Sequence, residues 1–179
     1  MARHTLVALV EDRPGVLNRM ASLCRRRGFN IESIAVGHTE TPRISRMTIV
    51  VEGTSTMVEQ LRKQLDKLVV TTKVSDITGE DIVARELALI KVKATSTTRS
   101  EIMQIVDIFR AGIVDVASDS VTVEVTGDED KVDSLLRLLH GFGIREVART
   151  GRIAVTRGVS VLAAMEKATP SRVRRQKQP

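Results

Sequence analysis

The chain has 179 residues and a formal net charge of +6, with 42% hydrophobic and 28% charged residues. These values are typical of one globular domain or two small ones, and they exclude a disordered or collagen-like chain. No apolar run is long enough to span a bilayer or to act as a secretory signal, so a cytoplasmic location is expected. The single cysteine, Cys24, excludes an internal disulfide and a cysteine-based metal site.

The first half of the chain alternates strand-like and helix-like segments. Apolar and β-branched residues predict strands at 5–10, 30–39, 46–52 and 69–74. Helical spacing predicts one helix from Val16 and a second after the capping residues 53–56, with an apolar stripe at Val58, Leu61, Leu65 and Leu68. The resulting order, βαββαβ, is the ferredoxin-like split motif.

The same order recurs in the second half. Strands are predicted at 87–94, 113–117, 121–125 and 144–148, with one helix capped by Ser100 and another after residues 127–130. At an offset of 74 residues, Gly53, Val58, Leu61 and Leu65 correspond to Gly127, Val132, Leu135 and Leu139. We therefore predict an α+β chain of two ferredoxin-like units, at residues 4–78 and 82–158, followed by a short helix at 159–166.

Units of this size leave one sheet face and the sheet edges uncovered. Such edges tend to be paired or covered in natural proteins. We therefore expect a homodimer, with the sheets extended side by side or packed face to face.

The positive charge gathers at the C-terminal end. Residues 166–179 hold five lysine and arginine residues and one glutamate, and this basic tail is expected to be disordered. The tail permits a nucleic-acid-binding sensor of amino acids as an alternative function. That alternative is weakened because the chain has no tryptophan, no tyrosine and three phenylalanines, too few aromatic rings for bases to stack on.

No pattern of residues indicates a catalytic centre. The three histidines, His4, His38 and His140, are isolated, and the motifs of nucleophile elbows, phosphate loops and dinucleotide-binding turns are absent. Residues 128–130, Asp-Glu-Asp, fit a metal site less well than the acidic first turn of a helix. The pattern favours a binding or regulatory module over a stand-alone enzyme, with no catalytic or metal-ligating residues.

The turn after the first strand has the chemistry of an anion site. Pro14 suits the first helical position, and Gly15 lets a ligand approach the backbone closely. The N–H groups of Gly15, Val16 and Leu17 would then face a carboxylate at the positive end of the helix dipole. Asp12 would accept a hydrogen bond from an ammonium group or cap the helix. An ordinary helix start explains the same residues, so both interpretations stay open.

The turn and its surroundings resemble a known family. The run 12–17, Asp-Arg-Pro-Gly-Val-Leu, is similar to the ACT domain. With 27–34 and 45–50 it resembles, more narrowly, the regulatory (small) subunit of acetohydroxyacid synthase, also called acetolactate synthase. In the second half, residues 85–92, 108–111 and 143–151 resemble the same family, so the likeness covers roughly 4–158.

The resemblance implies a role and a site. In that family the small subunit activates a separate catalytic subunit of the transferase complex, and it confers feedback inhibition by branched-chain amino acids, chiefly valine. Thiamine diphosphate, Mg and FAD are expected on this large catalytic partner and no cofactor on the small subunit; neither a membrane nor a nucleic acid is an expected partner. The effector would lie between paired ACT domains, held by the loop of one protomer and the second strand of the other. Carried over residue by residue, the implied valine site contains Asp12, Gly15, Val16 and Leu17 from one protomer, and Asn30 and Ile31 from its neighbour. The segment 34–36, with Val36, is our candidate for the wall near the aliphatic side chain; ordinary strand core explains the same residues, so both interpretations stay open.

Overall fold

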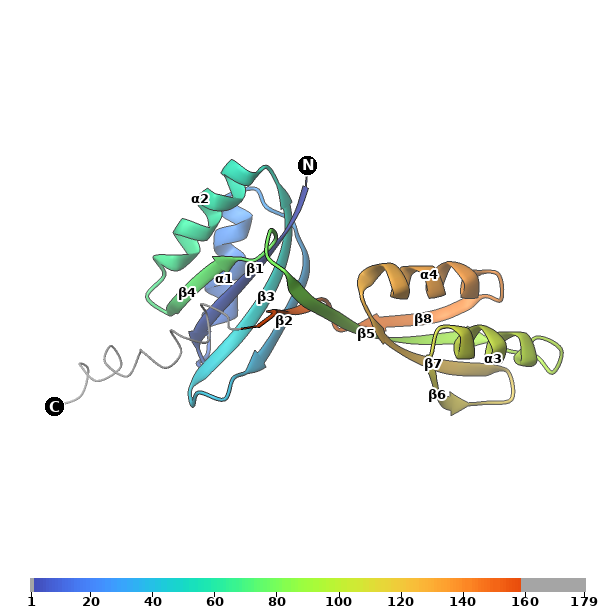
Figure 1. The fold of residues 1–179 in the computed structure, drawn as a ribbon. Coiled ribbons are helices and arrows are strands. Elements are labelled where there is room, and N and C mark those ends of the chain that lie inside the picture. The colour runs from blue at the N-terminus through green and yellow to red at the C-terminus, as the bar shows by residue number, and fades with distance from the viewer. Residues whose placement is uncertain (1, 159–179) are drawn as a thin grey trace.

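The computed structural model describes residues 2–158, which form two lobes (Figure 1). The first lobe consists of β1 (Ala2–Glu11), α1 (Val16–Arg26), β2 (Ile31–His38), β3 (Ile44–Gly53), α2 (Ser55–Asp66) and β4 (Thr71–Asp76). The rest of the described chain consists of β5 (Ile82–Lys93), α3 (Arg99–Ile108), β6 (Gly112–Val116), β7 (Ser120–Gly127), α4 (Glu129–His140), β8 (Ile144–Arg149) and β9 (Ile153–Thr156). The helix predicted at 159–166 and the basic tail lie outside the described residues.

Each lobe has an antiparallel sheet with two helices on one face. The strand order is β2-β3-β1-β4 in the first sheet and β6-β7-β5-β8 in the second. This confirms the predicted pair of ferredoxin-like βαββαβ units. Among residues 2–158, no helix is long and apolar enough to cross a membrane.

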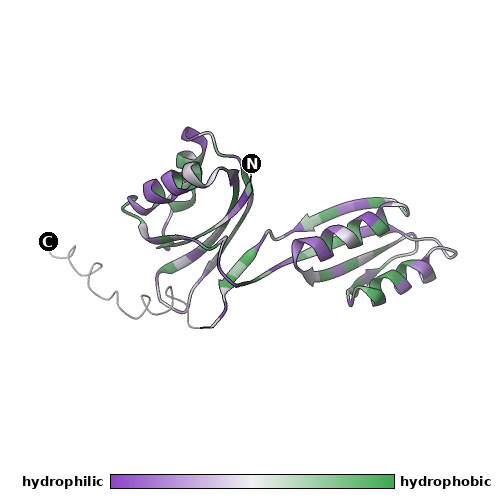
Figure 2. Ribbon diagram, turned by 45° about the horizontal axis from the view of Figure 1, so that its top comes forward, coloured by the Kyte–Doolittle hydropathy of each residue, from purple (hydrophilic) through white to green (hydrophobic). Residues whose placement is uncertain are grey.

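The cores lie between the sheets and their helices, where the sequence pattern puts them. In the first lobe, alternate residues of β1 such as Leu6 and Ala8 are fully buried against the α2 stripe of Val58, Leu61 and Leu65. The second core is built from the corresponding faces of β5, β7 and α4. Figure 2 shows hydrophobic and hydrophilic bands along the same helices, as expected of helices with one buried face.

The cap predicted for α2 is confirmed, and α4 has a side-chain cap as well. Thr54 Oγ1 accepts a hydrogen bond from the Met57 N–H at 3.3 Å. Asp128 Oδ1 accepts one from the Lys131 N–H at 2.9 Å. In each helix one N–H group of the first turn is thereby satisfied, and such a cap stabilises a helix by about 1 kcal/mol.

Several predicted boundaries are wrong, and the largest difference is at β5, which begins at Ile82 and not at Leu87. Ser100 does not cap α3, because that helix begins at Arg99 behind Thr98. The strand predicted from Val69 begins at Thr71 instead. Val69 is 84% exposed, so its apolar side chain did not mark a buried strand.

Strand β9 was not predicted, and it changes how the lobes are joined. It pairs with the first residues of β5, from Ile82 opposite Thr156 to Arg85 opposite Ile153. The two-stranded ribbon crosses the helix-free face of the first sheet, where it forms a small apolar cluster of Val7, Ile77, Ile82, Ala84 and Ala154. The expected start of the second unit, residue 82, therefore lies in a segment that packs against the first sheet.

The ribbon also bears on the expected dimer. The helix-free face of the first sheet is partly covered by its own chain, which leaves less of it for face-to-face packing of a second copy. Strand β2 pairs only with β3, so the outer edge of this sheet has no strand against it within the described residues. Strand β4 is the other edge of this sheet, so the fold leaves side-by-side extension open through β2 or through β4.

Candidate functional site

The loop after β1 leads into α1 through a glycine. Gly15 is the N-cap residue, with φ 85° and ψ −7°, a left-handed conformation that favours glycine. Pro14 precedes the cap, so its predicted place at the first helical position is wrong. A Cβ added at Gly15 would meet no atom within 4 Å. The first-turn N–H groups, including those of Val16 and Leu17, lack acceptors within the helix.

Asp12 does not cap α1, since the helix has no side-chain cap. Its Oδ2 lies 3.3 Å from Nδ1 of His38, at the end of β2. Its backbone N–H donates to the carbonyl oxygen of Arg43 at 2.8 Å. The loop is thus tied to the turn between β2 and β3, and the carboxylate, 47% exposed, stays accessible to a ligand.

The predicted site residues lie at two ends of the first sheet. Strands β1 and β2 both run antiparallel to β3, so they run parallel to each other. Ile31 and His4 are both level with Val51, whereas the loop lies at the other end, beyond Glu11. The seven-residue step from Ile31 to His38 corresponds to about 20 Å. Within one chain, Asn30 and Ile31 therefore do not meet the loop.

The aliphatic candidates lie at the loop end. Val36 is opposite Met47, a residue of the helix-side core, so both point to the helix-bearing face. Val36 is 50% exposed and Leu17 is 49% exposed, which is high for apolar side chains beside a core. The loop and the end of β2 thus place the exposed Asp12 carboxylate and the half-exposed Val36 at the same end of the first sheet, and Leu17 lies in the first turn of α1.

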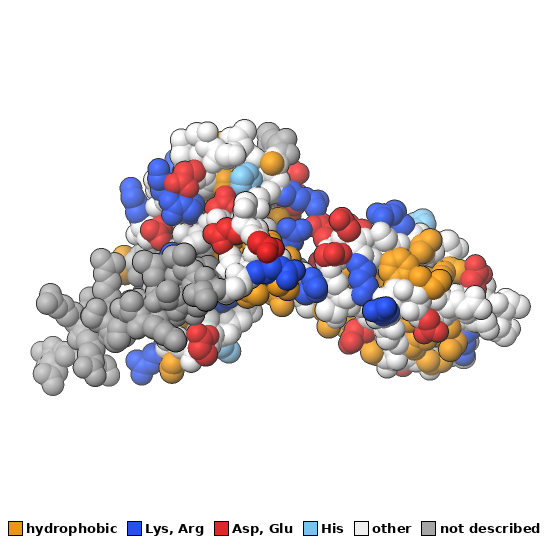
Figure 3. All heavy atoms as spheres, viewed as in Figure 1, with side chains coloured by type: hydrophobic (Ala, Val, Ile, Leu, Met, Phe, Trp, Pro, Cys, Tyr) orange, Lys and Arg blue, Asp and Glu red, His pale blue; other side chains and the backbone are white. Residues whose placement is uncertain are grey.

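A second cluster, which the sequence did not predict, lies between the lobes. Figure 3 shows lysine, arginine, aspartate and glutamate side chains gathered where the lobes meet. A cavity of about 490 Å³ is found there, and charged side chains from both lobes line it: Arg3, Glu32, Glu86, Glu129, Arg149 and Arg152. Glu129 and then Glu32 raise the pKa of the Arg3 guanidinium through their negative charge.

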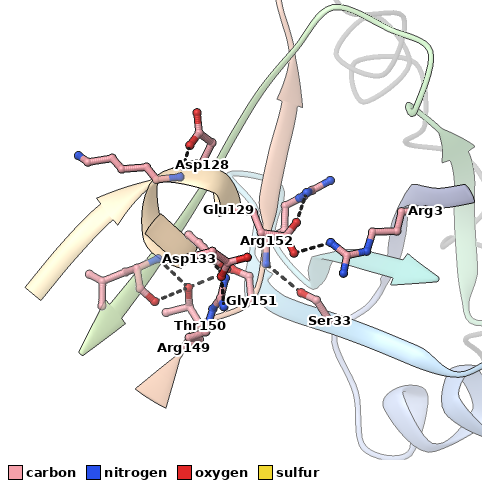
Figure 4. Close-up of polar contacts among 12 residues, drawn as sticks. Arg3, Ser33, Asp128, Glu129, Asp133, Arg149, Thr150, Gly151 and Arg152 are labelled. Atoms are coloured by element: carbon pink, nitrogen blue, oxygen red, sulfur yellow. Dashed lines mark hydrogen bonds and ion pairs between the residues drawn. The ribbon is translucent and has the colours of Figure 1, made fainter. Parts of the chain in front are cut away.

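Glu129 is central to this cluster (Figure 4). Its Oε1 accepts from Arg3 Nη1 and its Oε2 from Arg152 Nη2, both at 2.6 Å. Arg3 lies 126 residues away in sequence, so no local pattern marks the contact. The acidic run 128–130 forms the start of a helix, as expected, with Asp128 as the N-cap, and Glu129 also joins the two lobes. The described residues contain no group of three potential metal ligands.

The fold and the loop define the class of protein. Residues 6–73 match the family described as the AHAS small subunit-like ACT domain, and residues 85–158 match the one described as the small subunit of acetolactate synthase. The chain therefore carries an ACT domain followed by a second ferredoxin-like domain.

Relatives cover almost all of the described chain. A probable acetolactate synthase small subunit of Archaeoglobus fulgidus is 58% identical over 156 residues, which are 87% of this chain and 98% of that protein. The acetolactate synthase small subunit of Bacillus subtilis is 50% identical over 167 residues, 92% and 96% of the two chains. The crystal structure of the small subunit from Thermotoga maritima matches with a TM-score of 0.82 and 41% identity, covering 89% of this chain and all of that one. This chain belongs to the acetolactate synthase small-subunit family, which implies a complex with the catalytic subunit and regulation of it.

Proposed function

We propose that the chain binds valine between two copies of its first lobe, with loose selectivity against leucine and isoleucine. Binding of this effector inhibits the catalytic subunit. Without the effector the chain activates that subunit, which would carry thiamine diphosphate, Mg and FAD. The complex would act in the cytoplasm in valine, leucine and isoleucine biosynthesis. The family membership supports a regulatory role, and the geometry of the first lobe supports the site.

One observation carries the proposal: the loop after β1 and the start of β2 lie at opposite ends of one sheet, and β2 is one of its two edge strands. If two copies pair through β2 about a twofold axis, their β2 strands run antiparallel. The start of the partner's β2 then lies beside the end of the first copy's β2, next to the loop. Asn30 and Ile31 of one copy would thereby join Asp12 and Gly15 of the other, and a dimer would contain two such sites.

The chemistry of this composite site suits a small aliphatic amino acid. The first-turn N–H groups of α1 would bind the carboxylate, helped by the helix dipole. Asp12 would accept a hydrogen bond from the ammonium group, and the Asn30 amide would contribute from the neighbour. The half-exposed side chains of Leu17 and Val36 would contact the aliphatic part.

A ligand held by two protomers stabilises whichever dimer arrangement closes around it. Inhibition follows if this arrangement couples less well to the catalytic subunit. The coupling needed is modest, because allosteric couplings are typically about 1–3 kcal/mol.

The test is co-purification with the catalytic subunit of the same organism, followed by assays of acetolactate formation with and without the small subunit and valine. We expect the small subunit to raise the activity and valine to lower it again. A small subunit that binds its partner but leaves activity unchanged, with or without valine, would contradict the proposal.

A further inference from the structure

The segment that leads from the second lobe back to the first lies directly against β2. The Arg152 N–H donates to Ser33 Oγ at 2.9 Å. Gly151, at φ +79°, is so close that a Cβ there would lie 2.6 Å from Ser33 Oγ and 3.5 Å from the Ile34 carbonyl oxygen. This contact leaves no room for a side chain at residue 151. We therefore expect a displacement of β2 at Ser33 to move the linker with it.

The same segment is fixed to the second lobe by charge. Arg152 Nη2 and Arg3 Nη1 both donate to the Glu129 carboxylate, in the first turn of α4, and Arg3 also pairs with Glu32 of β2 at 2.9 Å. The side chains of Glu129 and Arg152 are 28% and 25% exposed, so this ion pair is screened less than a pair at the open surface, whereas Arg3 is half exposed. Figure 4 shows Arg3, Glu129, Arg152 and Ser33 in one chain of contacts. We call Ser33, Gly151, Arg152, Glu129 and Arg3 the β2–linker junction.

Strand β2 thus has two different faces. Its helix side holds Val36, at the loop end, whereas Ser33 is level with Val50 and points to the opposite face, toward the junction. A register shift between Ile31 and Ser33 lies next to this contact. One strand therefore contributes to the proposed effector site and also contacts the linker that positions α4.

We propose that the β2–linker junction transmits effector binding to the second lobe, so that inhibition of the catalytic subunit needs the junction whereas effector binding does not. The inference rests on the proposed function. Closure of the dimer around the effector shifts β2, the shift moves Gly151 and Arg152, and Glu129 carries it into α4. The second lobe then takes a different orientation relative to the first.

The decisive variant is Glu129→Gln, which keeps the shape of the side chain and removes its charge. Ser33→Ala, which removes only one acceptor, is the second variant in case the first folds poorly. Glu146→Gln is the matched control, because Glu146 pairs with Lys91 inside the second lobe. Calorimetry on each isolated small subunit gives the valine Kd, and assays with the catalytic subunit give activation and inhibition.

We expect Glu129→Gln and Ser33→Ala to bind valine within about twofold of the unchanged chain and to activate normally. The valine concentration for half inhibition should rise about fivefold or more, at the lower end of usual allosteric couplings. Glu146→Gln should behave like the unchanged chain. Undiminished inhibition in both variants would overturn the inference, and so would loss of valine binding, since the junction would then support the site instead of transmitting its state. If the unchanged chain neither binds valine nor inhibits, the proposed function itself fails.

A structural readout tests the same step without the catalytic subunit. Spin labels on Gln60→Cys and Gln104→Cys, in chains refolded with an excess of unlabelled chain so that most labelled dimers carry one labelled protomer, report the distance between α2 and α3 within one chain, and Cys24 is too buried to take a label. Valine should shift this distance distribution in the otherwise unchanged chain and leave it unshifted with Glu129→Gln. If valine binds both the otherwise unchanged chain and the Glu129→Gln variant but shifts the distance distribution in neither, the inference is overturned.

Discussion

Asp12 Oδ2 lies 3.3 Å from His38 Nδ1, and this contact joins the loop after β1 to the end of the edge strand β2. The loop is further held by the hydrogen bond from the Asp12 N–H to the Arg43 carbonyl oxygen. The pair keeps the carboxylate at the mouth of the proposed effector site without making it part of the helix.

The first prediction concerns this carboxylate. Asp12→Asn should weaken valine binding about tenfold, because a hydrogen bond to an ammonium group loses its charged acceptor. Titration calorimetry on the small subunit measures the effect. His38→Gln is the control: it removes the contact at β2 but not the charge, and it should cost less. Tighter binding by Asp12→Asn would mean that the carboxylate repels the acid end of the ligand.

The second prediction concerns Gly15. Gly15→Asp should relieve feedback, because an anionic side chain would occupy the space where the carboxylate of valine is expected. We expect the valine concentration for half inhibition to rise more than about tenfold, measured with the catalytic subunit. Gly15→Asn separates charge from conformation, since asparagine tolerates a left-handed backbone and has nearly the same shape. Inhibition that survives the aspartate variant unchanged would count against the site.

A third prediction is loose selectivity among the branched-chain amino acids. One methylene in an apolar pocket changes binding by only about 1–3 kcal/mol. Calorimetry should therefore find measurable binding of leucine and isoleucine beside valine, and much weaker binding of alanine, which reaches neither Leu17 nor Val36. Equal affinities for alanine and valine would exclude an aliphatic wall at these residues.

A fourth prediction is independent of function and concerns the Arg62–Glu59 pair on α2. Hydrogen bonds from Arg62, at 2.7 and 2.8 Å, lower the pKa of the Glu59 carboxyl to about 2. A carboxyl whose pKa is lower in the folded state than in the unfolded state stabilises the folded protein. This stabilisation is present above the pKa of the unfolded state, about 4.3, and is lost as the pH falls toward the pKa of the folded state.

Glu59→Gln should therefore lower the Tm slightly and equally at pH 7 and pH 5, and the difference should vanish between about pH 4 and 2. Thermal unfolding over this pH series measures it. Glu40→Gln, at an exposed loop position, is the control and should show no such pattern. If the Tm of Glu59→Gln stayed equally far below that of the unchanged chain at pH 2, the charge of Glu59 would not be the cause of the difference.

The elements that the sequence predicted best are those whose residues interact locally. The apolar stripe of α2, its Thr54 cap and the repeated strand order all follow from spacing within a few residues. Strand β9 did not, because its four residues, Ile153–Thr156, are too few to carry a period and acquire their role only by pairing with β5. Glu129 could be assigned to a helix start, but its bond to Arg3 depends on how the two lobes pack.

In the candidate site, too, the features that depend on local residues could be predicted, and those that depend on the whole sheet could not. The chemistry of the turn could be predicted from Asp12, Pro14 and Gly15, because each residue type has a local reason to be there. Pro14 lies two positions before the first helical residue, Val16, since the left-handed Gly15 takes the N-cap. That Asn30 lies far from the loop in its own chain depends on the parallel course of β1 and β2, a feature of the whole sheet.

This separation allows a test of the shared site by mixing variants. Each site in a twofold dimer would combine the loop of one protomer with Asn30 of the other. Gly15→Asp and Asn30→Ala should each impair both sites when alone, the second more weakly. A mixed dimer of the two variants contains one site with both changes and one site with neither, because the Asn30→Ala chain still provides an intact loop and the Gly15→Asp chain an intact Asn30.

After unfolding and refolding together in equal amounts, about half the dimers would be mixed, so about one quarter of the high-affinity valine sites should return. Calorimetry counts these sites, and each variant refolded alone is the control. If the loop and Asn30 acted within one protomer, every site in the mixture would carry one change and no high-affinity binding would return. The stoichiometry of the mixture therefore distinguishes a site shared across the β2 edge from one contained in a single chain.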